Sequence, residues 1–100
     1  MKQDYVAIVE IDSQGRLHVM PRKHEFPFVY REALEVSWDG ERRSLHSPVP
    51  RDWTYTRWLE QIIAAANAQG VHLVLGQDTQ WVNVPATVKA DLMQAVTHAV

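Results

Sequence analysis

Residues 52–76 read DWTYTRWLEQIIAAANAQGVHLVLG, and this stretch decides the fold. Its first part, Asp52–Gln69, predicts a helix because apolar side chains recur at helical spacing: Tyr55, Leu59, Ile62, Ile63 and Ala66. Asp52 or Thr54 is suited to the N-cap, and Gly70 to the left-handed residue that closes the helix. The apolar run Val71–Gly76 then predicts a buried strand. A helix turning directly into a buried strand indicates helices packed on a sheet.

Upstream, the pattern changes to that of a hairpin. The run Tyr5–Ile11 is β-branched and nearly continuous in apolar character, which predicts a strand covered on both faces at its start. Ser13–Gly15 is a turn signal, and Arg16–Met20 predicts a short second strand with Leu17 and Val19 on one side.

The stretch Phe26–Trp38 is ambiguous. We interpret it as two strand pieces because apolar residues alternate in each: Phe26, Phe28 and Tyr30, then Leu34, Val36 and Trp38. Residues 31–35 also have good helix propensity, so one helical turn there stays an alternative.

Asp39-Gly40 predicts a tight hairpin, because the pair favours a type I′ turn in which both residues have positive φ. The expected register places Trp38 opposite Glu41. It also pairs Val36 with Arg43 and Leu34 with Leu45.

The C-terminal part predicts a second helix. Gln77–Gln80 is a polar loop, and Trp81–Val84 is either a short strand or the lead-in to that helix. The helix is expected over Pro85–His98, with Asn83 as its cap. Its apolar stripe comprises Val88, Leu92, Ala95, Val96 and Ala99.

Taken together, the elements predict an α+β fold in a single globular domain, residues 1–100. The expected order is β-β-β-β-α-β-α: a two-layer sandwich with a mainly antiparallel sheet of about four to five strands and two helices on one face. This layout resembles that of many small bacterial domains of unassigned role, including toxin-immunity and mobile-gene-cassette proteins. The likeness is architectural, and no motif carries a functional residue over.

Composition excludes several functional classes. Ten basic and twelve acidic residues leave a net charge of −2, which gives no field to hold a nucleic acid. The absence of cysteine excludes disulfides, a thiolate zinc site and a cysteine nucleophile. No apolar run approaches the roughly 20 residues needed to cross a bilayer, and the N-terminus lacks the apolar stretch of a signal peptide. We therefore expect a cytoplasmic protein that binds neither nucleic acid nor membrane.

Motifs for catalysis or cofactor binding are missing. The five histidines form no HxxxH or HExxH pair, and the four glycines form no phosphate-binding loop. We predict no metal and no cofactor. His46 and His72 approach each other only if their strands pair, and a hydrolase-like enzyme would need these two to converge with Glu60.

Tryptophan is the unusual feature, with four in 100 residues. Trp53 and Trp58 are five positions apart on the helix, so both cannot lie at the centre of one buried stripe. Trp81 lies beside the polar loop that contains Asp78. Exposed aromatic residues are typical of protein interfaces and ligand pockets.

These observations lead to a ranked set of hypotheses. The first is a non-enzymatic interaction domain that forms a homodimer, or binds another protein, through exposed aromatic residues. The second is a domain that binds a small apolar or aromatic ligand between the sheet and the helices, near Trp81, Asp78 and the start of the first helix. The third is the small enzyme. The predicted binding residues are Trp53, Trp58, Asp78, Trp81, His46 and His72, and no residue is predicted to be catalytic.

Overall fold

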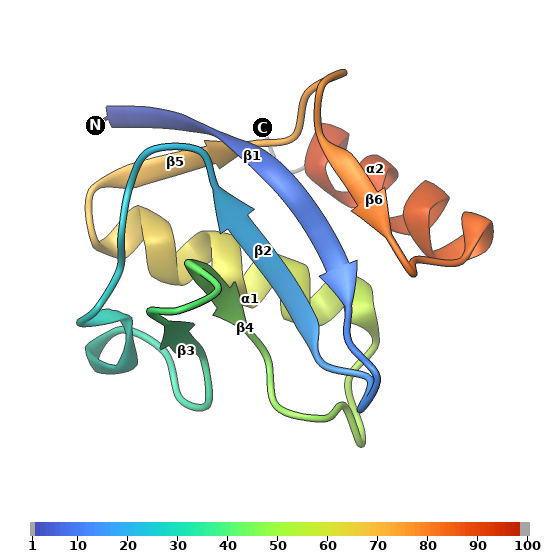
Figure 1. The fold of residues 1–100 in the computed structure, drawn as a ribbon, viewed down its shortest axis with the longest axis horizontal. Coiled ribbons are helices and arrows are strands. Elements are labelled where there is room, and N and C mark those ends of the chain that lie inside the picture. The colour runs from blue at the N-terminus through green and yellow to red at the C-terminus, as the bar shows by residue number, and fades with distance from the viewer. Residues whose placement is uncertain (1, 99–100) are drawn as a thin grey trace.

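The computed structural model describes residues 2–98 and has an α+β fold, as predicted (Figure 1). The first half contains, in chain order, β1 (Lys2–Ile11), β2 (Leu17–Pro21), the 3₁₀ helix η1 (Val29–Arg31), β3 (Ser37–Asp39) and β4 (Ser44–His46). The second half contains α1 (Tyr55–Ala68), β5 (Val71–Val74), β6 (Gln80–Val82) and α2 (Ala86–His98). The stretch Trp81–Val84, left open from the sequence, thus contributes to a short strand.

The sheet is mixed and mostly antiparallel. Its strand order is β3-β4-β2-β1-β5, and β6 pairs with β1 beside β5. All neighbours from β3 to β1 are antiparallel, whereas β5 and β6 both run parallel to β1. Lys2–Tyr5 of β1 pair with β5, and Ile8–Glu10 pair with β6. Because β5 pairs with its first residues, β1 begins three positions earlier than the apolar run predicts.

Thr79 fills the gap between the two parallel strands. Its hydroxyl donates to the carbonyl of Val6 at 2.7 Å and accepts from the backbone N–H of Gly76 at 3.0 Å. The register of β1 against β2 also shifts between Val6 and Ile8. One side chain therefore satisfies the backbone where β1 changes partner.

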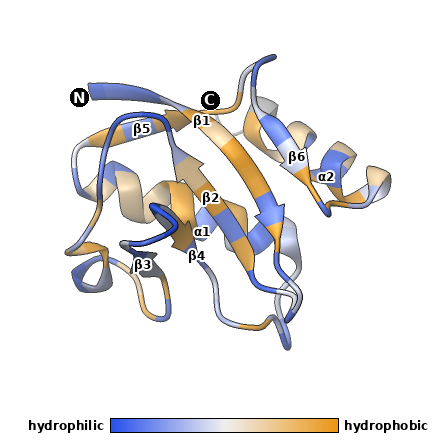
Figure 2. Ribbon diagram, in the orientation of Figure 1, coloured by the Kyte–Doolittle hydropathy of each residue, from blue (hydrophilic) through white to orange (hydrophobic). Residues whose placement is uncertain are grey.

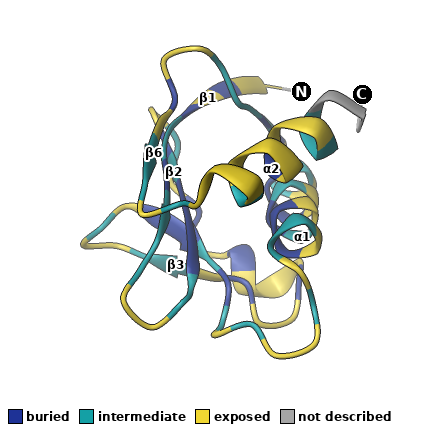
Figure 3. Ribbon diagram, turned by 90° about the vertical axis from the view of Figure 1, so that its right-hand side faces the viewer, coloured by how far each residue is buried: buried dark blue, intermediate teal, exposed yellow. Residues whose placement is uncertain are grey.

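The helices lie on the same side of the sheet (Figure 3). In Figure 2 hydrophobic residues line the middle of β1 and β2, while the N-terminal end of β1 is hydrophilic. The face of α1 towards the sheet consists of Trp58, Leu59, Ile62, Ala65 and Ala66. From α2, Leu92 enters the core and Val88 and Val96 pack against it. Ala99, predicted for the same stripe, lies outside the described residues.

Helix α1 begins at Tyr55, three residues after the predicted Asp52, and ends at Ala68, one residue before the predicted Gln69. The Thr54 hydroxyl accepts from the backbone N–H of Arg57 at 3.2 Å, so Thr54, and not Asp52, is the N-cap. Gly70 has φ 89°, the left-handed conformation expected of it.

The predicted turn of the β3–β4 hairpin is wrong. Trp38 pairs with Leu45 and Asp39 with Ser44, so the connection has four residues, 40–43. Instead of starting a type I′ turn, Asp39 accepts from the backbone N–H groups of Glu41 and Arg42 at 3.0 and 3.1 Å. Arg43, with φ 56°, takes the left-handed position. The side-chain hydrogen bonds of Asp39 thus stabilise a longer loop.

The strand predicted over Phe26–Tyr30 is also wrong, because the segment forms the 3₁₀ helix η1. The N–H of Val29 donates to the carbonyl of Phe26 at 3.1 Å, and the N–H of Glu32 donates to Val29 at 2.9 Å. Phe26 and Val29, three residues apart, are the buried pair, whereas Phe28 and Tyr30 face solvent. The alternating residues Phe26, Phe28 and Tyr30 therefore do not share one buried face.

Among the described residues, no helix has the length and apolar character that a membrane span requires.

Candidate functional site

A chain of polar side chains crosses the sheet on the face opposite the helices. His18 of β2 points there because its neighbours Leu17 and Val19 face the core. His18 Nε2 lies 2.8 Å from Asp12 Oδ2, and His18 Nδ1 lies 2.8 Å from Ser44 Oγ. The ring of His46 is tilted against that of His18, with 5.1 Å between centroids.

The electrostatics of this network fix its protonation. Burial lowers the pKa of His18, and the nearby Arg42 and His46 lower that pKa further against the opposing hydrogen bond of Asp12. Burial alone would raise the pKa of Asp12, but hydrogen bonds from His18 and from two backbone N–H groups outweigh it and lower this pKa to about 2. At neutral pH an uncharged His18 therefore donates through Nε2 to the Asp12 carboxylate and accepts through Nδ1 from the Ser44 hydroxyl.

The order Asp12, His18, Ser44 resembles that of a nucleophilic triad, but the geometry does not support catalysis. In a working triad the serine hydroxyl faces substrate, and the carboxylate orients the histidine through Nδ1. Here Ser44 is fully buried, and the carboxylate binds Nε2 instead. The network joins the β1–β2 turn to β2 and β4, which is a structural role.

A second candidate, which we call the tryptophan pocket, lies beside the start of α1. It is a cavity of about 240 Å³ lined by Leu34, Glu35, Pro48, Val49, Arg51, Asp52, Trp53, Trp58 and Gln61. The rings of Trp53 and Trp58 lie 4.7 Å apart between centroids, and the guanidinium of Arg57 lies 4.4 Å from the Trp53 centroid. At the rim, Glu35 and Arg51 form an exposed ion pair at 4.0 Å.

Two features of this pocket are energetically unfavourable as it stands. Trp58 is only 5% exposed, and its indole Nε1 is a buried side-chain nitrogen with no hydrogen-bond partner in the described part of the chain. An unsatisfied buried donor costs about 1–3 kcal/mol. Glu35 at the rim has φ 68°, which strains a residue with a side chain.

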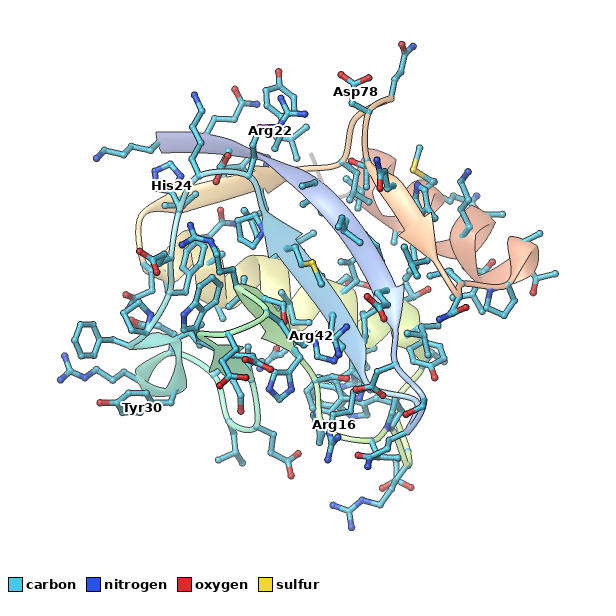
Figure 4. The ribbon with its side chains drawn as sticks, in the orientation of Figure 1. Arg16, Arg22, His24, Tyr30, Arg42 and Asp78 are labelled. Carbon is cyan, nitrogen blue, oxygen red and sulfur yellow. The ribbon has the colours of Figure 1, made fainter. Side chains whose placement is uncertain are left out.

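The third candidate is the segment 26–35, which we call the aromatic loop. Three of its side chains face solvent: Phe28 is 50% exposed, Tyr30 63% and Leu34 85%. The guanidinium of Arg31 lies 4.8 Å from the Phe28 centroid and 5.8 Å from that of Tyr30. In Figure 4, the Tyr30 side chain points away from the body of the molecule.

The base of the aromatic loop is held firmly. Phe26 is buried and packs edge-on against Trp38 at 5.9 Å between centroids. Lys23 and His24, shortly before Phe26 in the chain, donate their backbone N–H groups to the buried Asp4 carboxylate at 3.0 and 2.9 Å. The same carboxylate accepts from His24 Nδ1 at 2.9 Å. The loop therefore presents its exposed aromatic residues from an ordered base.

The six predicted binding residues are dispersed. Trp53 and Trp58 share the tryptophan pocket, with Trp58 buried and Trp53 covering the start of the helix. Trp81 lies on β6, where Lys89 Nζ is 5.6 Å from its centroid. Asp78 is exposed in the β5–β6 loop, at the top of Figure 4. Asp78 lines a cavity of about 250 Å³ with Tyr5 and Arg22, whereas the cavities beside the start of α1 are lined by Trp53 and by neither Asp78 nor Trp81.

His46 and His72 do not approach each other. Strands β2 and β1 lie between β4 and β5, so the two histidines are separated by roughly 14 Å at typical strand spacing. His72 instead lines a cavity of about 300 Å³ with Glu60, between α1, β5 and α2. His46 therefore does not converge with His72 and Glu60, which the enzyme hypothesis required.

No group of three or more histidine, aspartate or glutamate side chains within the described ranges is arranged to hold a metal ion. The polar residues with the strongest interactions, Asp4, Asp12, His18 and Ser44, were not predicted as a network. Their signal was weak: Asp4 and Asp12 flank an apolar strand, and His18 interrupts another.

Comparison with known proteins identifies the family. The model of the integron cassette protein Hfx_Cass5 family matches residues 4–79. This chain belongs to that family. The solved structure of integron cassette protein Hfx_Cass5, from the mobile metagenome of the North West Arm sewage outfall, is 59% identical. The match covers 97% of this chain and 98% of that one, with a TM-score of 0.50. The search of curated proteins found no match. The family has no assigned function.

Proposed function

We propose that this cassette protein is a non-enzymatic interaction domain that self-associates through its aromatic loop. The observation that carries the proposal is the exposure of Phe28, Tyr30 and Leu34 on one short segment with an ordered base. Contiguous apolar patches of more than a few hundred Å² are rare on monomers and often mark an interaction site.

The composition of the aromatic loop is that of an interface. Tyrosine and arginine are enriched among the residues that dominate binding energy, and Phe28, Tyr30 and Arg31 form one stacked group. Arg31 is followed directly by Glu32, so the surface carries both charges. A two-fold dimer brings the same surface together from both copies, which requires such self-complementarity.

Sedimentation velocity over a range of micromolar to millimolar concentrations tests the proposal. We expect the wild type to change from monomer to dimer, and Phe28→Ser or Leu34→Ser to remain monomeric. Tyr5→Ser is the matched control, because Tyr5 is as exposed as Phe28 but lies on β1, beside Arg22 at the other side of the molecule (Figure 4). A wild type that stays monomeric throughout, or a dimer lost only in Tyr5→Ser, would contradict the proposal.

The apolar cavity between α1, β5 and α2 favours a second candidate function, the binding of a small apolar ligand. Leu59, Ile63 and Leu73 form its walls, with the polar groups of Glu60, Asn67 and His72 among its lining. Its volume of about 300 Å³ lies at the lower end of ligand pockets, roughly 300–1,000 Å³. A thermal-shift screen of small apolar compounds tests it. Binding that Ala64→Trp abolishes would support the cavity, and a screen without hits would count against it.

A further inference from the structure

We propose that the C-terminal segment, which begins at Gln80 and comprises β6 and α2, exchanges between two copies of this chain. In one chain, β6 pairs with β1 and α2 packs against α1. In the exchanged pair, each segment makes these contacts with the other copy, and the loop 75–79 is the hinge. This inference goes beyond the proposed function, because the aromatic loop takes no part in it.

Strands β5 and β6 are two parts of one edge strand that the hinge interrupts. Both run parallel to β1, where Tyr5 pairs with Val74 and Ile8 pairs with Gln80. Between these two pairs β1 advances by three residues, from 5 to 8, while the other chain segment advances by six, from 74 to 80. The surplus residues form the loop. Six extended residues span about 20 Å, so an opened hinge reaches well beyond its own β1.

The closed hinge depends on one side chain. The N–H of Thr79 donates to the carbonyl of Gly76 at 3.2 Å, and the Thr79 hydroxyl joins the N–H of Gly76 to the carbonyl of Val6. Gln77 and Asp78 are exposed, and the loop projects from the top of the molecule in Figure 1. The hydrogen bonds of Thr79 therefore keep the loop folded back on its own chain.

The segment beyond the hinge contributes little to the core of its own chain. Over residues 80–96, where burial is described, Leu92 is the one fully buried side chain. The other apolar side chains that pack against the core are only partly buried: Trp81, Val84, Val88 and Val96. The cavity of about 300 Å³ between α1, β5 and α2 shows that this interface is incompletely filled. Releasing the segment thus leaves most of the core in place.

A second copy is the partner because its segment has the same sequence. Opening the hinge uncovers the surface of β1 and α1 against which β6 and α2 pack. The same segment from another copy restores each of those contacts, so new interactions are needed only at the hinge. For this reason the exchange of an identical element is a low-cost route to a dimer.

The related Hfx_Cass5 structure differs from this one in its overall arrangement. The two chains are 59% identical over 97% of this chain, yet their TM-score is 0.50. The family model ends at Thr79, directly before the segment that we propose to exchange. The boundary of the shared sequence pattern thus coincides with the end of the hinge.

Disulfides introduced into this cysteine-free chain test the exchange. Ile8→Cys with Gln80→Cys links β1 to the exchanged segment, whereas Gln3→Cys with His72→Cys links β1 to β5, which stays with its own chain. Paired strands lie about 4.8 Å apart, within the reach of a disulfide. Each variant is refolded from urea at micromolar to millimolar concentration, oxidised and analysed on a non-reducing gel.

We expect the pair on β1 and β6 to give a covalent dimer whose share rises with concentration. Glu10→Cys with Val82→Cys, the next pair along the same strands, should give the same result. The control pair on β1 and β5 should close within single chains and remain a monomer.

Thr79→Val, added to the pair on β1 and β6, tests the hinge. It should lower the concentration at which half of the chains are dimeric about 30-fold, because two closed chains each lose hydrogen bonds that the opened hinge does not make. Thr87→Val makes the same chemical change at an exposed position of α2 and should have no effect.

The outcomes separate the exchange from the proposed function. Disulfides that stay within single chains at every concentration, even in Thr79→Val, overturn the exchange. Covalent dimers that are equally abundant with the control pair also overturn it, because they would arise from chance contact between copies. A dimer seen in sedimentation while all disulfides stay within chains leaves only the aromatic loop proposal standing. Phe28→Ser should leave the covalent dimer unchanged, because the aromatic loop is not part of the exchange.

Discussion

Replacing Asp4 with asparagine probes the buried carboxylate that holds the base of the aromatic loop. Its Oδ2 accepts from two backbone N–H groups and from His24 Nδ1, and its Oδ1 accepts from the N–H of Tyr5 at 2.9 Å. Asparagine has one carbonyl oxygen, so at least one of these four donors would face an NH₂ group instead.

The expected loss of stability in Asp4→Asn follows from the hydrogen bonds that the Asp4 carboxylate accepts. A hydrogen bond to a charged group contributes about 1.5–3 kcal/mol against about 0.5–1.5 for a neutral one, and a buried donor without a partner costs about 1–3. The His24 side chain is partly exposed, so its hydrogen bond to Asp4 contributes less to stability than the buried ones do. We expect Asp4→Asn to lower the free energy of unfolding by about 3 kcal/mol, which is a large part of the roughly 5–15 kcal/mol of a typical domain. The melting temperature should fall by about 12–24 °C.

Urea denaturation at pH 7 and below pH 3 measures this effect and its cause. Burial alone would raise the pKa of Asp4, but the hydrogen bonds from His24 and Lys23 outweigh it and hold this pKa below its ordinary value of 3.8. Its stabilisation is therefore present above pH 3.8 and is lost as the pH falls through the pKa of the folded state. The difference between wild type and variant should narrow in acid.

Asp78→Asn is the matched control, since it makes the same chemical change at an exposed position and should alter the free energy of unfolding by less than about 0.5 kcal/mol. An Asp4→Asn variant as stable as this control at pH 7 would refute the reasoning. So would a stability difference that persists undiminished in strong acid, because it would not arise from the ionised carboxylate.

Three further predictions concern stability. Gly70→Ala should destabilise by about 1 kcal/mol in thermal unfolding, because φ is 89° there, whereas Gly40→Ala should be close to neutral; equal effects would contradict this. The pKa values of His18 and Asp12 are lowered in the folded state, so the free energy of unfolding should decrease as the pH drops below 6.5, and decrease again as it drops below 3.8. Urea titrations across this pH range measure both decreases, and in His18→Gln the first decrease should be smaller. Thr79→Val should cost about 1–3 kcal/mol and speed amide exchange in β6 first, since the lost hydroxyl joins β1 to the β5–β6 loop; uniform exchange would argue against that role.

Short-range sequence patterns predicted the structure correctly where it depends on one helix face or on one residue at a helix end. The stripe along α1, the cap at Thr54 and the left-handed Gly70 depend on residues within a few positions of each other. The dispersion of His46 and His72 was not predictable in this way, because it depends on which strands are neighbours in the sheet.

The aromatic loop shows why alternation misled. Phe26, Phe28 and Tyr30 alternate as in a strand, yet Phe26 is buried against Trp38 and the other two face solvent. A side chain enters the core when the rest of the fold leaves room for it, and the alternation of Phe26, Phe28 and Tyr30 does not report that room.

The amino-acid sequence by itself determined the α+β class, the two helices and the excess of tryptophan, because these follow from composition and short-range periodicity. Only the tertiary structure decided that Asp12, His18 and Ser44 form a buried network, that Trp53 and Trp58 border a pocket, and that the aromatic loop is exposed. Burial, cavity volume and hydrogen-bond partners arise between segments far apart in the chain, so they exist only once the strands have paired.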